Sequence, residues 1–545
     1  MPDQLRDEDR DLAADWWREG VLYQIYPRSF QDSNGDGIGD LPGITSRLDH
    51  LATLGIDGIW LSPFYPSPMK DFGYDVSDYT GVEPAYGTLE DFDRLVQAAH
   101  ERRIHVVVDL VPNHTSDQHP WFRESRSSRT NPRRDWYVWA DPKPDGSAPN
   151  NWTSAFTRRQ TSAWTLDEAT GQYYMHSFLP EQPDLNWWNP EVRAAFDEIL
   201  RFWLDRGVDG FRIDVAHRMA RDPELRDNPD FELPVGEIVR FWTDEHPPRD
   251  QDWPEVHEIL RGFRRTLDAY DARMAIGEVF ILDPARLVRY YGERDDELHM
   301  AFNFAFLRAP WSAEAFRSEV ETFERLLPAS AWPDYTLSNH DNPRAISRYA
   351  VAGDPARTGA RARLAALMLL TLRGTPFVYY GEEIGQPDGE VPAGRVVDVA
   401  GRDPERTPMQ WDASPTAGFT WGDPWLPVGS STRTVNVAAQ SDDPRSMLAF
   451  YRRLIAERRR SLALRRGSYA TLPGLPQDVF GYARDAGDDR RLIVLNFGAE
   501  PVTIDRDRLG PAPTVILAAD PDRSIGPITG PLRLSPDDGV LVAPG

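Results

Sequence analysis

The chain has 545 residues and no cysteine, which excludes disulfide bonds, thiolate nucleophiles and cysteine metal sites. Its first ten residues, MPDQLRDEDR, hold no apolar stretch, so we expect no signal peptide. No run in the sequence approaches the roughly 18 apolar residues of a membrane-spanning helix. These absences predict a cytoplasmic protein that has no membrane partner.

Positive charge is also scarce, with 61 Lys and Arg against 86 Asp and Glu and a net charge of −25. This balance argues against nucleic acid or anionic lipid as a partner and is compatible with a neutral substrate. The length predicts two or three domains, and 40% hydrophobic residues are enough for globular cores. The sequence shows no internal repeat and no low-complexity tract.

Eight strand-like segments are separated mostly by helical patterns. Two of the helices begin with clear signals: Thr88 and Asp91 resemble a capping box, and Asn189-Pro190 supplies a cap and an N1 proline. Alternating strands and helices imply a parallel sheet, and eight of each imply a closed (β/α)8 TIM barrel of the α/β class. The predicted strands cover residues 21–30, 56–64, 104–112, 210–215, 274–280, 300–307, 335–339 and 376–380.

The uneven spacing of the strands predicts three insertions. The segment between the third strand and the helix at Asn189 is too long for a loop in a compact domain, so we expect a subdomain there. Insertions at 218–254 and 386–412 follow the fourth and eighth strands. After a last barrel helix at 447–464, short apolar runs between Pro, Gly and Asp turns predict a small all-β sandwich. The predicted domains are the barrel at 1–114 and 185–466, the inserted subdomain at 115–184 and the C-terminal domain at 467–545.

The segment 210–214, Gly-Phe-Arg-Ile-Asp, carries the most informative pair of side chains. Arg212 and Asp214 are two residues apart on a strand, so they face the same side. The guanidinium would hold the carboxylate ionised, as a nucleophile requires, although an isolated pair of this kind is more often a structural salt bridge. Two further apolar runs end in Glu278 and Asp341, and a third ends in His114. Such polar tips gather at the carboxyl ends of parallel strands.

Four of these segments, in this order, resemble the signature regions of the α-amylase family of glycoside hydrolases, family 13. They are D-L-V-P-N-H at 109–114, G-F-R-I-D at 210–214, G-E-V-F at 277–280 and S-N-H-D at 338–341. Q-P-D-L-N at 182–186 resembles a fifth signature, that of the α-glucosidase and oligo-1,6-glucosidase branch. The resemblance runs from about residue 16 to 411 and places the family's domain B at 115–184. Five ordered motifs make it highly specific.

The resemblance implies a retaining reaction at a sugar's anomeric carbon, which needs two carboxyl groups ~5 Å apart. Asp214 is the predicted nucleophile. Glu278 is the predicted general acid/base, because the apolar run before it favours the protonated form by desolvation. Asp341, by resemblance, grips sugar hydroxyls as the ring distorts. His114 and His340 would donate to ring hydroxyls of the same sugar.

Further substrate contacts follow from the same resemblance. Tyr74 would form a flat stacking floor for the sugar. Asp71 matches an acid that pairs with an arginine in exo-acting branches, which would close the site beyond the terminal glucose. Arg406 is the favoured partner of Asp71, and Arg402 is the alternative. A purely structural role, in which both arginines only bond loop carbonyls, also remains open. Phe156 and Val215 complete the predicted substrate contacts.

Val215 bears on the choice of linkage. A valine directly after the nucleophile accompanies α-1,6 cleavage in relatives, and a threonine accompanies α-1,4 cleavage. Exchanging a hydroxyl for a methyl group is worth only a few-fold to about a hundredfold in discrimination. The linkage therefore stays open.

Residues 32–40 have oxygen ligands at alternate positions and a glycine at the sixth, like the first part of a calcium loop. An EF-hand needs Glu at the twelfth position, where Gly43 stands. The branch named above carries a standalone loop of this type, with a turn that binds no metal as the alternative. The predicted ligands of one structural Ca²⁺ or Mg²⁺ are Asp32, Asn34, Asp36, the Ile38 carbonyl and Asp40.

The leading hypothesis is a retaining exo-acting α-glucosidase, a monomer or homodimer. It would release terminal α-linked glucose from short oligosaccharides or α-glucosides through a covalent glucosyl intermediate on Asp214. An alternative enzyme passes the same intermediate to a sugar or alcohol, as sucrose isomerases and trehalose synthases do. A non-catalytic companion subunit of a membrane transporter is disfavoured, because such relatives lack the full acid set and carry a membrane anchor. Chain length and aglycone are left open.

Overall fold

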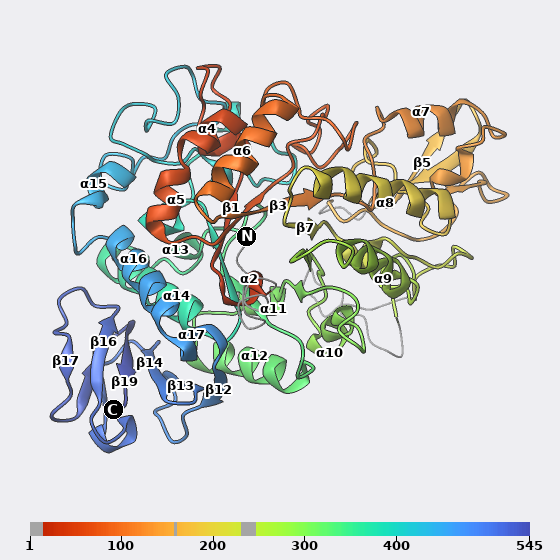
Figure 1. Ribbon diagram of the computed structural model, residues 1–545. Helices are drawn as coiled ribbons and strands as arrows, with labels where there is room; N and C mark the ends of the chain where they lie inside the picture. The colour runs from red at the N-terminus through yellow and green to blue at the C-terminus, as the bar shows by residue number, and fades with distance from the viewer. Residues whose placement is uncertain (1–14, 157–160, 230–246) are drawn as a thin grey trace, which may run out of the picture.

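The structure is a computed structural model that describes residues 15–156, 161–229 and 247–545. The first ten residues and residues 230–246 of the predicted insertion at 218–254 lie outside the described residues. Helices surround a central set of strands, the C-terminal strands lie at one side, and α7 (Pro120–Ser127) and β5 (Trp164–Asp167) lie at the opposite side (Figure 1). None of the described helices is long and apolar enough to cross a membrane.

Eight parallel strands form one sheet in the order β10-β11-β1-β2-β3-β7-β8-β9, a nearly closed barrel. Each predicted strand has a counterpart in this sheet, so the predicted TIM-barrel fold is confirmed. The strands are β1 (Leu22–Ile25), β2 (Gly58–Leu61), β3 (His105–Leu110), β7 (Gly210–Ile213), β8 (Met274–Gly277), β9 (Met300–Ala301), β10 (Asp334–Thr336) and β11 (Thr375–Tyr379).

Two strands are much shorter than predicted. The predicted strand at 21–30 stops at Ile25, because Pro27 takes the first position of a short helix, α3 (Pro27–Phe30). The predicted strand at 300–307 is β9 for two residues only. Asn303 then caps α11 (Phe304–Arg308) by accepting a hydrogen bond from the backbone N–H of Phe306. In both cases a residue that starts a helix ends the strand, although the residues that follow are apolar.

Helices follow the strands around the barrel. Thr88 and Asp91 form the predicted capping box of α6, and Asn189 caps α8. The predicted last barrel helix at 447–464 is two helices, α16 and α17 (Leu462–Arg466), since Ser461 caps the second one. The main covering helices are α5 (Leu48–Leu54), α6 (Leu89–Glu101), α8 (Pro190–Asp205), α9 (Val256–Leu267), α12 (Ala313–Leu326), α14 (Pro355–Thr371) and α16 (Met447–Arg460).

Alternation along the strands divides the apolar side chains between two cores. Phe211 and Ile213 of β7 belong to the large core that includes the apolar faces of the helices. A smaller core contains Leu22, Trp60, Val107, Ile276 and Phe377, each from a different barrel strand. The interior of a barrel is packed with layers of this kind. The polar residues predicted as site residues lie at the carboxyl ends of the strands, next to the smaller core.

The 115–184 segment and the C-terminal region carry sheets of their own. The first holds β5, β4 (Trp139–Ala140) and β6 (Gln172–Met175) in the order β4-β6-β5, and its two ends meet where His114 bridges to Asp184. The C-terminal strands form an antiparallel sheet in the order β12-β13-β14-β19-β16-β17. They are β12 (Ser468–Thr471), β13 (Val479–Ala486), β14 (Asp489–Asn496), β16 (Thr514–Ala518), β17 (Gly526–Pro527) and β19 (Asp538–Ala543), with β15 (Val502–Ile504) pairing β18 (Leu532–Leu534) beside them.

Candidate active site

Arg212 of β7 is the centre of the site. The parallel register sets it directly beside Asp109 of β3, and its Nη1 donates to both carboxylate oxygens of Asp109 at 2.8 and 3.1 Å. The guanidinium lies over the ring of Trp60, 5.1 Å from the centroid. Gly210 opens this strand because a Cβ there would lie 2.7 Å from the carbonyl oxygen of Met274 on β8.

The two acids predicted to react share the guanidinium of Arg212. Asp214 Oδ1 lies 2.7 Å from Nη1, and Glu278 Oε2 lies 2.6 Å from Nη2. The two carboxylates are therefore bound to the two terminal nitrogens of one planar group. Their side chains keep 7% and 13% of their exposure, so each is almost buried but reachable.

Val215, directly after Asp214, has the unusual backbone angles φ 36° and ψ 46°. A β-branched residue rarely adopts the left-handed region, and such strain costs about 1–3 kcal/mol. The turn points the Val215 backbone N–H at Glu278 Oε2, 3.2 Å away. Val215 thus contacts the second acid through its backbone, which the sequence alone did not indicate.

The surroundings of Asp214 correct the expectation that Arg212 simply keeps it ionised. Burial raises the pKa of Asp214 well above its ordinary value, Arg212 lowers it, and the charges of Glu278 and Asp109 raise it again. Burial also raises the pKa of Asp109 to about 7. Three carboxyl groups share one guanidinium, so ionising all of them would leave excess negative charge in a buried place. The cluster consequently holds at least one proton at neutral pH.

Tyr74 and His340 lie face to face beside this cluster. Their ring centroids are 5.3 Å apart with planes 6° from parallel, and the tyrosine hydroxyl is 2.6 Å from His340 Nε2. Tyr74 also donates to Asp109 at 3.1 Å. Burial lowers the pKa of His340 well below its ordinary value, so the ring is neutral and can accept or donate one hydrogen bond on each side. Tyr74 itself is 5% exposed.

A second arginine gathers the loop-borne acids, and here the favoured prediction was wrong. Asp71 is bound by Arg402 at 2.5 Å, not by Arg406. Arg402 also reaches Asp341 at 3.0 Å and Asp398 at 2.6 Å. Arg406 instead donates to the carbonyl oxygen of His340 at 2.7 Å and to Asp341 at 2.8 Å.

Asp341 differs from Asp214 because two guanidinium groups contact it. Burial opposes its ionisation, but the guanidinium groups of Arg402 and Arg406 outweigh burial and hold the pKa of Asp341 well below its ordinary value. Its side chain is 27% exposed, more than that of either other predicted acid. Asp341 is thus a fixed anion that faces solvent.

His114 and Phe156 lie on the side formed by the 115–184 segment. Gln182 connects His114 to Asp71, since its amide nitrogen lies 3.1 Å from His114 Nε2 and 2.9 Å from Asp71 Oδ2. The ring of Phe178 packs on His114 at 5.2 Å and on Phe156 at 5.0 Å. The guanidinium of Arg402 lies over Phe156, 4.9 Å from its centroid. All twelve predicted catalytic and substrate-binding residues therefore belong to one connected assembly.

The assembly also contains Asp109, Gln182, Asp398 and Phe178, which were not predicted as site residues. Asp109 had a signal, because it is a charged residue inside the apolar run 106–111. Gln182 stands in a segment quoted for its family resemblance but was given no role. Asp398 and Phe178 lie in loops with no periodic pattern, so only the structure reveals them.

The predicted metal loop is folded around its own backbone N–H groups. Asp32 accepts from the N–H groups of Asn34, Gly35 and Gly37 at 2.7–2.9 Å. Asp40 accepts from Ser33, and the exposed side chains of Asn34 and Asp36 each accept one such bond. Among the described residues no three His, Asp or Glu side chains converge as metal ligands. The donor set, all oxygen, still fits a hard divalent cation by type.

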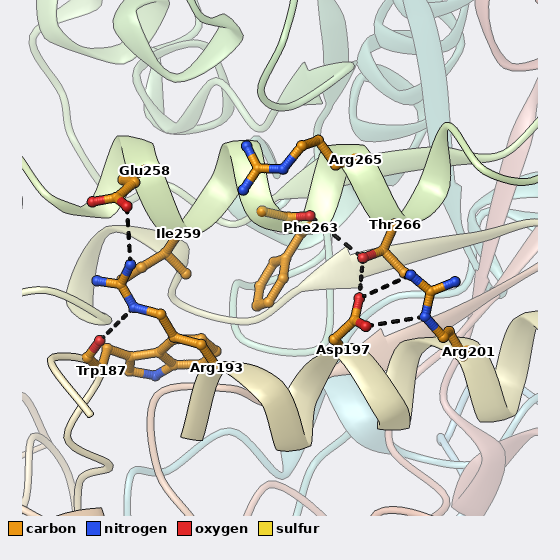
Figure 2. A pocket seen from close by; sticks show the side chains of 10 residues that line it. Trp187, Arg193, Asp197, Arg201, Glu258, Ile259, Phe263, Arg265 and Thr266 are labelled. Carbon is orange, nitrogen blue, oxygen red and sulfur yellow. Dashed lines mark hydrogen bonds and ion pairs between the residues drawn. The ribbon is translucent and has the colours of Figure 1, made fainter. Parts of the chain in front are cut away.

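A separate groove of about 310 Å³ runs between α8 and α9 (Figure 2). Four of its charged side chains form two ion pairs: Arg193 with Glu258 at 3.3 Å, and Arg201 with Asp197 at 3.0 Å. None of the predicted site residues lines it. The groove is distinct from the candidate active site.

Comparison with known proteins identifies the family. Residues 24–467 match the catalytic domain of alpha amylase. The chain is 45% identical over 517 residues to a probable alpha-glucosidase of Rhizobium meliloti, covering 92% of each chain. It is 40% identical to the oligo-1,6-glucosidase of Parageobacillus thermoglucosidasius, over 88% of this chain and 90% of the relative.

Solved structures agree with this family. An alpha-glucosyl transfer enzyme, XgtA, superposes with a TM-score of 0.88 at 40% identity, over 97% of this chain and 99% of the other. The trehalulose synthase MutB of Pseudomonas mesoacidophila gives a TM-score of 0.88 at 36% identity, with the same coverage. The resemblance drawn from five short segments is confirmed, and the chain belongs to the alpha-amylase family of glycoside hydrolases.

Proposed function

We propose that the chain is a retaining, exo-acting α-glucosidase that releases terminal α-linked glucose from short oligosaccharides or α-glucosides. The observation that carries the proposal is the binding of Asp214 and Glu278 to the two ends of one guanidinium, at 2.7 and 2.6 Å. Two carboxyl groups that share one guanidinium favour the short spacing of a retaining enzyme over the wider spacing with which an inverting enzyme accommodates a water. The glucosidase names of the relatives support the substrate class.

The residues divide the chemistry as follows. Asp214 attacks the anomeric carbon as a carboxylate, with Arg212 and the barrel register fixing its direction. Glu278, bound to the other end of the same guanidinium, gives a proton to the leaving oxygen. In the second half, Glu278 takes a proton from water, which attacks the glucosyl ester and frees Asp214 with the α configuration kept. Asp341, a fixed anion, accepts hydrogen bonds from ring hydroxyls.

The bond from Asp71 to Arg402 supports exo action. Arg402 ties Asp71, Asp341 and its own loop acid Asp398 together, so the three form a polar wall beyond the glucose. Desolvated groups that hydrogen-bond a terminal hydroxyl discriminate strongly against a substrate that lacks it. A longer chain running through this wall would break those ion pairs.

A covalent trap tests the proposal. Incubation with a ring-fluorinated α-glucosyl fluoride should release the anomeric fluoride and add one fluoroglucosyl mass to a peptide containing Asp214, seen by mass spectrometry. Asp214→Asn should lower kcat on p-nitrophenyl α-glucoside at least about 10³-fold, since removal of a nucleophile has effects of that order or larger. Release of β-glucose as the first product, or an unlabelled Asp214 peptide, would refute it.

A second candidate function is transfer of the same glucosyl group to a sugar or alcohol. The similarity to a glucosyl transfer enzyme and a trehalulose synthase favours it. Product analysis with maltose, isomaltose, sucrose and trehalose separates the two. Free glucose supports hydrolysis, and isomerised or longer glucosides support transfer.

We also propose that the loop at 32–40 binds Ca²⁺ or Mg²⁺ through the side chains of Asp32, Asn34, Asp36 and Asp40 and the Ile38 carbonyl. A bound ion would supply only cross-linking charge, because the loop follows β1 and contains none of the acids above. Addition of a chelator should lower the melting temperature, and Asp36→Asn should remove that dependence. An unchanged melting temperature would leave the loop a hydrogen-bonded turn. A cytoplasmic location stays a prediction from the sequence.

A further inference from the structure

Arg218 and Asp250 face each other beside the candidate active site without forming a hydrogen bond. The nearest approach of their charged groups is 4.0 Å, from Nη1 of Arg218 to Oδ2 of Asp250. The other oxygen of Asp250, Oδ1, is buried and has no hydrogen-bond partner in the part of the chain that the structure describes. Within the described residues the Arg218 guanidinium likewise has no hydrogen-bonded acceptor. Both side chains are nearly buried, with 14% and 10% of their exposure left.

Arg218 differs from the other arginines of the site, which bind carboxylates at hydrogen-bond distance. Arg212 and Arg402 each bind three carboxylates at 3.0 Å or less. Arg406 binds Asp341, and Arg221 binds Asp184. A buried charge without a hydrogen-bonded partner is expensive, and burial lowers the pKa of Arg218, which Asp250 offsets only in part. The pair therefore has unused capacity to donate and to accept.

The position of Arg218 relates it to the leaving side of the reaction. It ends the short helix η2 (Ala216–Arg218), four residues after Asp214, and the charge of Glu278 acts on it. Its guanidinium lies 5.7 Å from the centroid of Phe178, whose ring packs on Phe156. Arg402, which forms the wall beyond the glucose, lies over Phe156. A row of contacts thus runs from Arg218 through Phe178 and Phe156 to Arg402, so Arg218 is at the opposite end of this row from the arginine of the wall.

We propose that Arg218 and Asp250 form the binding site for the leaving group and select a polyhydroxylated one, a second sugar or a polyol. The guanidinium donates to one hydroxyl oxygen, and the Asp250 carboxylate accepts from the neighbouring hydroxyl. A pair of adjacent hydroxyls spans the 4.0 Å gap and satisfies both charges at once. This inference rests on the proposed glucosidase function and specifies its substrate.

The charges of Arg218 and Asp250 disfavour two other kinds of leaving group. An anionic group would gain from Arg218 but would lie against Asp250, and the charge of Asp184 also acts there. An apolar aromatic group would leave both charged side chains without hydrogen bonds in a nearly buried place. A neutral group with at least two hydroxyls avoids both costs.

The test compares two leaving groups in isosteric variants. Arg218→Gln and Asp250→Asn should each lower kcat/KM for maltose or isomaltose by at least about tenfold, as the loss of a buried hydrogen bond to a substrate hydroxyl predicts. With p-nitrophenyl α-glucoside, whose leaving group lacks hydroxyls, kcat/KM should stay within about threefold of wild type. The double variant should lose less than the product of the two single losses, because one diol contacts both residues.

The aryl substrate also serves as the folding control for each variant. Arg226→Gln is the matched charge control, since Arg226 lies in the same insertion but is half exposed and already paired with Asp222. Equal losses on both substrates, no loss on the disaccharides, or a gain for Asp250→Asn would overturn the inference. Wild-type enzyme that hydrolyses neither substrate would instead overturn the proposed function.

Discussion

Two arginines organise the candidate active site, and they are held in different ways. Arg212 lies in a barrel strand, and its acids stand on β3 or directly after β7 and β8. Arg402 lies in the loop after β11, and its acids come from the loops after β2 and β10 and from its own loop. Strand register fixes the first cluster, whereas only the contacts themselves fix the second.

The difference has energetic consequences. Arg212 and Asp109 have 1% and 0% of their side-chain exposure, so the first cluster depends on every partner being present. Removing one partner of such a buried pair costs about 3–5 kcal/mol. The second cluster contains Asp341, which is 27% exposed, so water can replace part of a lost contact. We therefore expect changes at Arg212 to affect chemistry and folding together, and changes at Arg402 to affect mainly substrate binding.

The largest effect should follow from Arg212→Lys. A lysine offers one point charge and cannot bind three carboxylates in a plane, so kcat should fall about 10³-fold or more. The melting temperature should fall as well, measured by circular dichroism. Asp109→Asn is the control that keeps the arginine, and it should lose less activity. A variant with full kcat would show that the shared guanidinium does not position the two acids.

Arg402→Lys should have a smaller effect of a different kind. The loss of bonds to Asp71 and Asp341 should lower kcat/KM about 10²-fold through KM, since uniform substrate binding is removed. The melting temperature should fall less than in Arg212→Lys, because water can replace part of the contact with the more exposed Asp341. Arg406→Lys is the matched control from the same loop. If Arg406→Lys impaired KM more than Arg402→Lys, the loop arginines would have the opposite roles.

Residues on strands could be placed from the sequence, whereas residues in loops could not. Arg212 and Asp214 could be placed together because residues two apart on a strand must face one side. Asp109 was quoted but not used, although a charge inside an apolar strand signals a buried partner. Arg402 and Arg406 lie in a loop without periodicity, so the sequence could not decide which of them reaches Asp71. The favoured residue was four positions from the correct one, in a segment that has no repeating geometry.

The fold shows a similar limit. Eight strands and their order were predictable, since apolar runs alternate with amphipathic helices. The lengths of two strands were not, because Pro27 and Asn303 start helices inside runs that remain apolar. An apolar run indicates that a segment is buried. Strands and helices at the barrel's rim are both buried, so such a run does not show where a strand ends and a helix begins.

Asp398→Asn sharpens the comparison within the loop cluster. Asp398 accepts from the backbone N–H, Nε and Nη2 of Arg402, and so aims this guanidinium at Asp71. It touches no predicted reacting group and acts as a positioning residue. We expect KM to rise about tenfold with kcat almost unchanged, measured with p-nitrophenyl α-glucoside. Asp398→Glu should restore part of the loss, and an equal fall in kcat would argue for a general structural role instead.

The smallest effect on activity should come from Asp334, a barrel carboxyl group that has no arginine. It starts β10 at the opposite end of the strands and is fully buried, and neither of its oxygens has a hydrogen-bond partner among residues 15–156, 161–229 and 247–545. Burial raises its pKa to about 8. Between its ordinary pKa and pH 8 the folded state keeps a proton that the unfolded chain has lost, so this group makes stability fall as pH rises.

Asp334→Asn, which does not titrate, should leave kcat unchanged and raise the melting temperature relative to wild type by at least about 2 °C at pH 8 and by less at pH 5. An advantage that shrank with rising pH would mean that Asp334 is ionised in the folded state and paired, as Asp109 is with Arg212.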